Sequence, residues 1–369
     1  MSVDELLRPG ILVLCGSDGV GKTTTAAALA ARAAVREDMH VAVLTIDPAR
    51  RLANAMGLAK LGNRLRQVNL SAAATTTAKG KLEAGMLETK SAWDQLIIEQ
   101  AGSYEKAEKI LANPFYKEIS GAFVGSHEYI AMERLYDLHQ SGKYDLIVLD
   151  TPPSRNALDF LEAPNRMTEL VSGGLLGLLA RPGMFAGKVG LRMFSLTAKP
   201  IMRIADNLLG GSTLGELSEF LVSVEDMYGG FKARAEGVYN LLGQASTSFL
   251  VVTTLEDVPF EEARFFVEKL SQAGMHLVGA IVNKRLPSYL LDPAATNLAR
   301  RLLERSTPVE RALAENFLAY RTLGQRDNDL MARIAELGVP LLGSVPRMSE
   351  PVGDLSGLLE IGRLLAEGG

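Results

Sequence analysis

The stretch ILVLCGSDGVGKTTT, residues 11–25, decides the fold class. Residues 11–15 form an apolar run of the kind that fills a buried strand. Residues 16–23, GSDGVGKT, follow directly and match the pattern G-x-x-x-x-G-K-[ST]. An alanine-rich segment that favours a helix begins near Lys22. Strand, glycine loop and helix in this order are the context in which the pattern forms a phosphate-binding loop.

Each residue type in this loop suits the binding of a triphosphate. The glycines allow the backbone to curl until successive N–H groups face phosphate oxygens, and the following helix adds the positive end of its dipole. Lys22 can reach the β and γ phosphates, and the Thr23 hydroxyl can bind Mg²⁺. The sequence therefore predicts a site for ATP or ADP with Mg²⁺, formed by Gly16, Ser17, Asp18, Gly19, Val20, Gly21, Lys22, Thr23 and Thr24.

Composition limits the class of protein. The 369 residues are 47% hydrophobic with a net charge of −4, which is typical of globular proteins and argues against a general nucleic-acid-binding face. No apolar run reaches the length of about eighteen residues that spans a membrane, and the start, MSVDELLRPG, lacks a signal-peptide core. We therefore expect a cytoplasmic protein without a transmembrane segment, and peripheral membrane association stays open. The single cysteine, Cys15, permits no intrachain disulfide and is expected to be buried.

Strand-like runs alternate with helical patterns along the chain. The expected strands after the first are residues 40–46, 68–70, 144–149, 249–253, 277–282 and 340–344. The expected helices are residues 79–142 with a break at Asn113-Pro114, 259–273, 293–337 and 355–366. This order predicts an α/β fold with a doubly wound, mainly parallel sheet of the P-loop NTPase type and an inserted helical subdomain.

Residues 165–242 differ from the rest of the chain. They are rich in Leu, Met, Phe and Gly, and no strand run stands out among them. We assign residues 1–78, 141–164 and 245–369 to a nucleotide-binding core, and residues 79–140 and 165–244 to the helical subdomain. Ordinary core packing explains many of these apolar residues. The sharper interpretation is an apolar groove, because methionine adapts to varied partners and apolar helices can accept an amphipathic or transmembrane helix.

Two aspartates follow predicted strands. Asp47 comes after residues 40–46, and Asp150 comes after residues 144–149. Open α/β sheets place ligand chemistry at the carboxyl ends of their strands. Two carboxylates near Mg²⁺ would balance charge and accept a proton from water. The alternative is that both aspartates only cap the helices that follow them.

Four motifs in order resemble the anion-transporting ATPase family, which contains the arsenite-pump ATPases and the tail-anchored-protein targeting ATPases. They are GSDGVGKTT at 16–24, TIDPARRLANAMG at 45–57, LDTPPSRNALDFLEAP at 149–164, and VNK at 282–284. The segments 113–138 and 227–236 are similar to the bacterial, actinobacterial-type branch, whose phosphate loop is a deviant Walker A motif.

The resemblance implies a role for single residues in catalysis. Asp47 would belong to switch I and orient the attacking water, and Asp150 would belong to switch II and hold a water on Mg²⁺. Lys22 would act in catalysis together with Asp47 and Asp150. Thr23, Asp47 and Asp150 would form the Mg²⁺ site.

The resemblance also implies a nucleoside site. Glu256 would lie near the nucleoside, although Leu255 stands where the family has proline. Asn283 would bind adenine, and Pro346 would belong to the adenine loop.

Three departures from the family pattern bear on activity. Ser17 replaces the signature lysine that reaches across a dimer, so a lysine-bearing paralogue or one of Arg50, Arg51 and Arg155 would have to supply that charge. Asp18 replaces a glycine, and a carboxylate facing triphosphate would cost about 1–4 kcal/mol unless it points away or pairs with a cation. No C-x-x-C follows Asn283, which excludes the zinc-clasped dimer of the eukaryotic targeting proteins.

The resemblance favours an ATP-hydrolysing, dimeric nucleotide switch that handles a hydrophobic segment or a membrane-protein client. The dimer would be a homodimer or a heterodimer with a paralogue. One alternative is the ATPase subunit of an arsenite-type efflux pump, which a lone cysteine and a single phosphate loop make less favourable. The other alternative, motivated by Ser17 and Asp18, is a weakly hydrolysing regulatory partner of a related ATPase.

Overall fold

The computed structural model describes residues 2–46, 51–58, 62, 64–72, 78–119, 126–151, 227–305 and 307–367. The chain divides into two compact units. The sheet unit comprises Met1–Leu87, Asp137–Leu158 and Leu242–Gly369, and the helical unit comprises Glu88–Tyr136 and Asp159–Leu241. Among the described residues, no helix combines the length and the apolar character needed to cross a bilayer.

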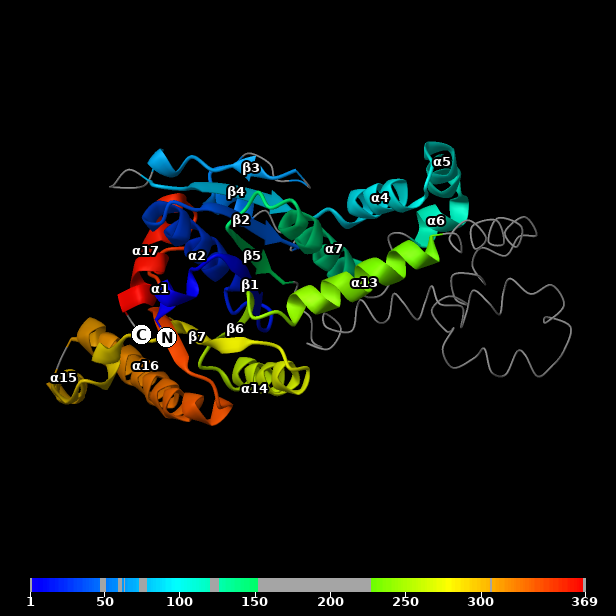
Figure 1. Cartoon of the computed structure of the whole chain (residues 1–369). Helices are drawn as coiled ribbons and strands as arrows, with labels where there is room; N and C mark the ends of the chain where they lie inside the picture. Colours follow the sequence, from blue (N-terminus) through cyan, green and yellow to red (C-terminus); the bar gives the residue numbers. More distant parts are fainter. Residues whose placement is uncertain are drawn as a thin grey trace, which may run out of the picture. The chain divides into compact units, whose positions relative to one another are not determined.

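An eight-stranded sheet forms the sheet unit, with strand order β3-β4-β2-β5-β1-β6-β7-β8 (Figure 1). All neighbouring pairs are parallel except β3 and β4. The central strands β1, β2, β5 and β6 are buried along almost their whole length, as expected for a parallel sheet covered on both faces. The predicted mainly parallel α/β fold is thereby confirmed. The strands are β1 Gly10–Cys15, β2 His40–Thr45, β3 Arg66–Gln67, β4 Lys81–Met86, β5 Leu146–Asp150, β6 Thr247–Thr253, β7 Leu277–Arg285 and β8 Leu341–Pro346.

Helices of the sheet unit bury alternate strand residues. On one face, α2 and α17 lie side by side (Figure 1) and share a core with Leu12, Val43 and Val148. The alanines of α2 let this helix approach the sheet and α17 closely, since an alanine side chain is a single methyl group. The helices of this unit are α1 Val3–Leu6, α2 Lys22–Arg36, α3 Arg51–Ala55, α14 Asp257–Gln272, α15 Pro293–Arg305, α16 Pro308–Arg333 and α17 Leu355–Glu367.

A buried ion pair joins two helices of the helical unit. Glu133 of α7 is 3% exposed, and it accepts hydrogen bonds from Tyr129 and from Arg234 Nε, the latter at 2.6 Å. The Tyr129 ring stacks on Trp93 with centroids 5.7 Å apart. A buried carboxylate needs such partners, so Tyr129 and Arg234 satisfy Glu133 and link α7 to α13. The helices described here are α4 Thr89–Gln100, α5 Tyr104–Ala112, α6 Pro114–Ile119, α7 Ser126–Gln140 and α13 Tyr228–Leu242.

The expectation that residues 79–142 are helical from their start is wrong for the first part. Residues Lys81–Met86 form β4, which pairs with β2 in the sheet. Leu82 and Ala84 are buried there, whereas Lys81 is exposed. This alternation has the period of a strand, but Lys, Leu, Glu and Ala are also good helix formers. Pairing with β2 therefore decides the conformation, and the segment belongs to the sheet unit.

Two further expectations need correction. Residues 68–70 are not a strand, because β3 is Arg66–Gln67 and a 3-10 helix, Leu70–Ala72, follows. The single helix expected over 293–337 is two helices, followed by a 3-10 turn at Ile334–Leu337. Pro308 starts α16, and Thr307 and Glu310 form a capping box in front of it. Proline lacks an N–H group and the capping box satisfies the first turn, so the chain restarts a helix here.

Several predicted features lie outside the described residues. They include Asp47, the cation candidates Arg50 and Arg155, and residues 165–226 of the expected groove. The side chain of Arg51 is also outside the description.

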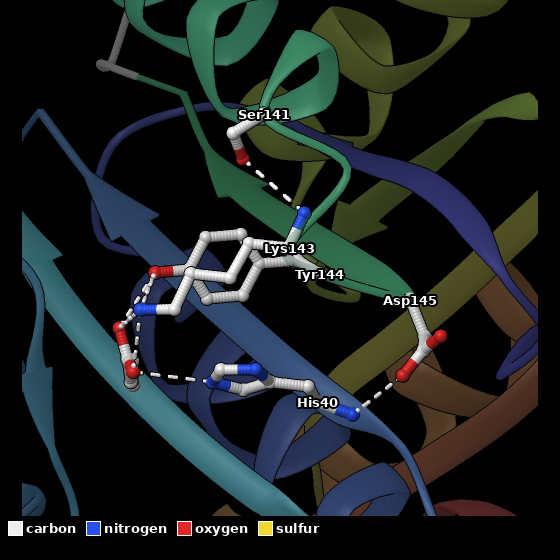
Figure 2. Close-up of polar contacts among 6 residues, drawn as sticks. His40, Ser141, Lys143, Tyr144 and Asp145 are labelled. Atoms are coloured by element: carbon white, nitrogen blue, oxygen red, sulfur yellow. Dashed lines mark hydrogen bonds and ion pairs between the residues drawn. The ribbon is translucent and has the colours of Figure 1, made fainter.

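A polar cluster around Glu83 ties β2, β4 and the residues just before β5 together. Figure 2 labels its members His40, Lys143, Tyr144 and Asp145. The Glu83 carboxylate accepts hydrogen bonds from Tyr144 Oη at 2.6 Å, from Lys143 Nζ at 3.0 Å and from His40 Nε2 at 3.1 Å. Asp145 accepts the backbone N–H of His40 at 2.7 Å. Burial acts to raise the pKa of Glu83, but the hydrogen bonds from Tyr144 and Lys143 outweigh burial and hold this pKa below its ordinary value of 4.5.

Replacing Glu83 by glutamine should therefore destabilise the sheet unit in a pH-dependent way. The ionised carboxylate stabilises the fold fully above the ordinary pKa, and this contribution is lost as pH falls through the lowered pKa. We expect E83Q to lower the free energy of unfolding by about 1–2 kcal/mol at pH 7, and the difference from wild type to shrink below about pH 4. Urea denaturation at pH 7 and below about pH 4 measures the free energy of unfolding of both proteins. Glu268→Gln, at an exposed position, serves as control. An equal loss at both pH values would contradict the ionic explanation.

Candidate nucleotide-binding site

The loop after β1 is tightly constrained at its two ends. Gly16 has φ +149°, and a Cβ atom there would lie 2.2 Å from the carbonyl oxygen of Val252 in β6. Gly21 has φ +94°, and a Cβ atom there would lie 2.2 Å from Asn283 Nδ2. Only glycine fits both positions without moving the backbone. The loop is thus packed against the ends of β6 and β7.

The loop leads directly into the N-terminus of α2. Gly21 is the N-cap residue, and within this described segment no side chain caps the first turn and no acidic residue lies in it. The N–H groups of the first turn and the positive end of the helix dipole are therefore available to an anion.

Lys22 lies inside the loop rather than in solvent. The residue is 6% exposed, and its Nζ atom donates a hydrogen bond to the Ser17 carbonyl oxygen at 2.7 Å. This hydrogen bond crosses the loop from Lys22, near its end, to Ser17, near its start. The ammonium group is therefore held inside the curl of the backbone. The position is suited to a lysine that meets a phosphate.

Asp150, the last residue of β5, is brought to the start of α2. It is 1% exposed, and its Oδ2 atom accepts hydrogen bonds from Thr23 Oγ1 at 2.6 Å and from Thr45 Oγ1 at 2.7 Å. The strand register explains this meeting, because Leu14 of β1 and Thr45 of β2 both lie beside Asp150. The predicted pair Thr23 and Asp150 is therefore adjacent. Thr45, which the sequence analysis missed, orients the carboxylate.

Asn283 of β7 holds the outer side of the loop. Its Nδ2 atom donates to the Val20 carbonyl oxygen at 2.8 Å. The residue that follows it, Lys284, also contacts the loop. The sequence shows Lys284 only as the last residue of the VNK motif, with no role of its own. Asn283 was expected at an adenine ring, and the structure places it at the phosphate loop, beside the cavity described next.

A cavity of about 540 Å³ opens at the ends of β6 and β7. Glu256 lines it together with apolar and charged side chains from α14, β7 and α16. Burial raises the pKa of one lining carboxyl group, Asp327, although the backbone N–H of Leu286 donates to it. Pro346 is exposed at the end of β8, and it pairs in register with Arg285. The other lining residues are Thr254, Leu255, Asp257, Val258, Pro259, Lys284, Leu286, Tyr320, Leu323, Arg326 and Arg347.

The two unusual loop residues differ in environment. Ser17 is 7% exposed, and its hydroxyl oxygen has no hydrogen-bond partner among the described residues. Asp18 is exposed to solvent, and no ion pair to it is found in the part of the chain that the structure describes. Solvent exposure weakens the repulsion that Asp18 would exert on a phosphate group.

Cys15 is an inert neighbour of this loop. It is 4% exposed at the end of β1, and burial raises the pKa of its thiol to about 12, against the opposing effect of Lys22. The expected burial of this residue is confirmed. A thiol that stays protonated at neutral pH is a poor soft ligand.

The residues present fit a magnesium–nucleotide pair. The buried carboxylate of Asp150 and the hydroxyl group of Thr23 are the hard oxygen ligands that Mg²⁺ prefers. The buried hydroxyl of Ser17 offers a further hydrogen-bond donor in the loop. Lys22 and the first turn of α2 supply positive charge. Asp47, the third expected member, lies outside the described residues.

Comparison with known proteins identifies relatives. The family model for anion-transporting ATPases matches residues 10–307, which include the loop, Asp150 and Asn283. ATPase GET3 of Malassezia globosa is 26% identical over 284 residues, covering 74% of this chain and 72% of the relative. ATPase GET3 of Rhodotorula glutinis is 24% identical over 306 residues, covering 83% and 77%. A protein of Aquifex aeolicus, whose name proposes an arsenical pump-driving ATPase, is 25% identical over 280 residues, covering 74% and 79%.

Proposed function

This chain belongs to the anion-transporting ATPase family, and from that premise we propose that it binds and hydrolyses ATP as a dimeric nucleotide switch for a hydrophobic or membrane-protein client. Family membership and relatives named as ATPases support a nucleotide-hydrolysing ATPase. The observation that carries the nucleotide site is the meeting of Lys22, Thr23 and Asp150 at one loop.

The phosphate end of the site would work by positioning and charge. N–H groups of the loop and of the first turn of α2 bind phosphate oxygens, and the Lys22 ammonium exchanges its bond to Ser17 for one to phosphate. Thr23 and Asp150 would hold Mg²⁺, which neutralises charge on the β and γ phosphates when bound. Asp47 would orient the attacking water, as the family resemblance implies. Little covalent chemistry is left for the protein to perform.

The nucleoside end would occupy the cavity next to Glu256. Its volume of about 540 Å³ is adequate for a ribose and a base, and its lining combines apolar side chains with a few polar groups. Asn283, which precedes the lining residue Lys284, is bound to the loop at Val20. Glu256, Asn283 and Pro346 are the proposed nucleoside contacts.

Ser17 sets the proposed rate of hydrolysis. Its hydroxyl can donate to a phosphate oxygen but carries no charge, so transition-state stabilisation by a crossing lysine is absent in a homodimer. We therefore expect slow turnover for the chain alone, and faster turnover when a lysine-bearing paralogue completes the dimer.

Client handling is proposed for the helical unit. The support is the composition of residues 165–242, rich in Leu and Met, together with the similarity to ATPase GET3. Closure of a dimer around ATP would assemble the apolar surface, and hydrolysis would release it.

An anion pump is the second candidate, favoured by the name of the Aquifex aeolicus relative. The chain's own residues argue against thiolate regulation by arsenite, because its lone cysteine is buried and its pKa is raised.

Two assays test the proposal. The purified protein is given ATP with Mg²⁺, and released phosphate is measured with and without arsenite. In parallel, a fluorescent apolar helical peptide is titrated with no nucleotide, ADP or ATP, and a polar peptide of equal length is the control. We expect the peptide affinity to change about tenfold between nucleotide states.

Three other outcomes would change the conclusion. Failure to bind ATP would overturn the whole proposal. Stimulation of phosphate release by arsenite would favour the pump, and ATP binding without phosphate release would indicate a regulatory partner.

A further inference from the structure

Lys284 has a backbone conformation that no other described non-glycine residue shares. Its φ is +58°, in the left-handed region, near the end of β7. Lysine has no local side-chain hydrogen bond that compensates for this conformation, as asparagine has. Strained residues of this kind persist where the surrounding structure holds them, and they concentrate at functional sites.

Contacts to the phosphate loop hold Lys284 in place. Its Nζ atom donates to the Gly19 carbonyl oxygen at 2.6 Å, and its backbone N–H donates to Asn283 Oδ1 at 2.9 Å. Asn283 in turn donates to the Val20 carbonyl oxygen at 2.8 Å. Two consecutive residues of β7 thus bind two consecutive carbonyl groups of the loop.

These contacts fix the direction of the loop's N–H groups. In a trans peptide, the carbonyl group and the following N–H group point in opposite directions. The carbonyls of Gly19 and Val20 are directed toward β7, so the N–H groups of Val20 and Gly21 are directed away from it. A loop that binds phosphate needs its N–H groups turned inward together. Gly19 is exposed, and a Cβ atom added to it would meet no atom within 4 Å, so no packing on that side restrains this part of the loop.

Lys284 is also one of the residues that line the cavity of about 540 Å³. With its ammonium group bound to Gly19, the alkyl stem is the part of the side chain that would face the cavity. Val258, Tyr320 and Leu323 add apolar surface to the lining. An apolar stem with a tethered charged end is a suitable surface for the face of a flat base.

We propose that Lys284 is a positioning residue that couples the two ends of the nucleotide site: its ammonium group sets the loop's N–H groups for phosphate, and its stem contacts the base. This inference rests on the proposed nucleotide site and deepens it. Among the described residues, Lys284 is a cation bound to the outer side of the loop. A base that packs on the stem holds the ammonium on Gly19, so nucleoside binding and phosphate binding favour each other.

Three substitutions separate the parts of this side chain in the full-length protein. K284M keeps the stem without the ammonium group, K284G removes both and relieves the strained φ, and K284R restores a charged donor. The probes are ATP, inorganic tripolyphosphate and adenosine, measured by calorimetry. Lys269→Met is the matched control, because Lys269 bonds to Gln272 on α14 and does not line this cavity.

We expect K284M to weaken ATP and tripolyphosphate about tenfold while adenosine binding changes less than about twofold, since a charged hydrogen bond to the loop is lost. K284G should weaken adenosine as well, K284R should recover most of the ATP affinity, and the melting temperature of nucleotide-free K284G should stay within about 2 °C of wild type.

Normal binding of all three probes by K284M and K284G would overturn the inference while leaving the proposed function intact. A fall in melting temperature that parallels the loss of ATP affinity, without rescue by K284R, would also overturn it and indicate a purely structural role. If the wild type itself bound neither ATP nor tripolyphosphate, the proposed function would have failed instead.

Discussion

Lys22→Ala should abolish detectable ATP hydrolysis, with a loss of at least about a hundredfold in kcat/KM. The reason lies in the position of the ammonium group, which is buried within the loop and bonded to the Ser17 carbonyl oxygen. A charge held there in advance needs little reorganisation when negative charge develops on the transferred phosphoryl group. Alanine removes this charge and leaves the backbone of α2 unchanged, since it is a good helix former.

The measurement is steady-state phosphate release, combined with the affinity for a fluorescent ATP analogue. Lys269→Ala serves as control, because that lysine bonds to Gln272 on α14. Loss of turnover with a smaller loss of affinity would place the effect in the transition state. Unchanged turnover in K22A would contradict a catalytic lysine at this position and remove the chemical basis for the loop's assignment.

The position of this lysine could be predicted because its signal is contiguous. An apolar strand, a glycine loop and an alanine-rich helix follow one another within residues 11–36, and each element is favoured by its own sequence. The same holds for Asp150, since a buried run ends in an acidic residue. In both cases the conformation that the local sequence favours is the one that the sheet requires, so the local sequence is enough to predict the position of the residue.

Residues whose roles depend on strand register were not predictable in this way. Thr45 bonds to Asp150 because β2 and β5 are neighbouring strands whose register places these two residues side by side. The sequence around Thr45 does not indicate this partner. Lys284 was quoted as part of a motif, but its bond to Gly19 depends on a left-handed backbone that the sequence does not reveal. For β4 the local preference pointed to a helix, and pairing with β2 overrode it.

The second large effect is expected for Asp150→Asn, which keeps the shape of the side chain and removes its charge. The carboxylate is 1% exposed and accepts the hydroxyl groups of Thr23 and Thr45. If it helps to hold Mg²⁺, D150N should lower Mg²⁺-dependent hydrolysis by about a hundredfold or more. ADP affinity in EDTA should change less than about threefold, because the loop's own contacts to phosphate remain.

Stability decides between a functional and a purely structural role for Asp150. A buried carboxylate kept for metal binding costs free energy in the metal-free fold, so D150N should melt at the same temperature as wild type or higher without nucleotide. A carboxylate kept only to bond Thr23 and Thr45 would instead make D150N less stable. We would therefore measure two properties on the same preparations. One is the nucleotide affinity with and without Mg²⁺, and the other is the melting temperature in the absence of both nucleotide and Mg²⁺. A D150N protein that melts lower and still gains affinity from Mg²⁺ as wild type does would refute the metal role, because removing the charge would then have changed the fold alone.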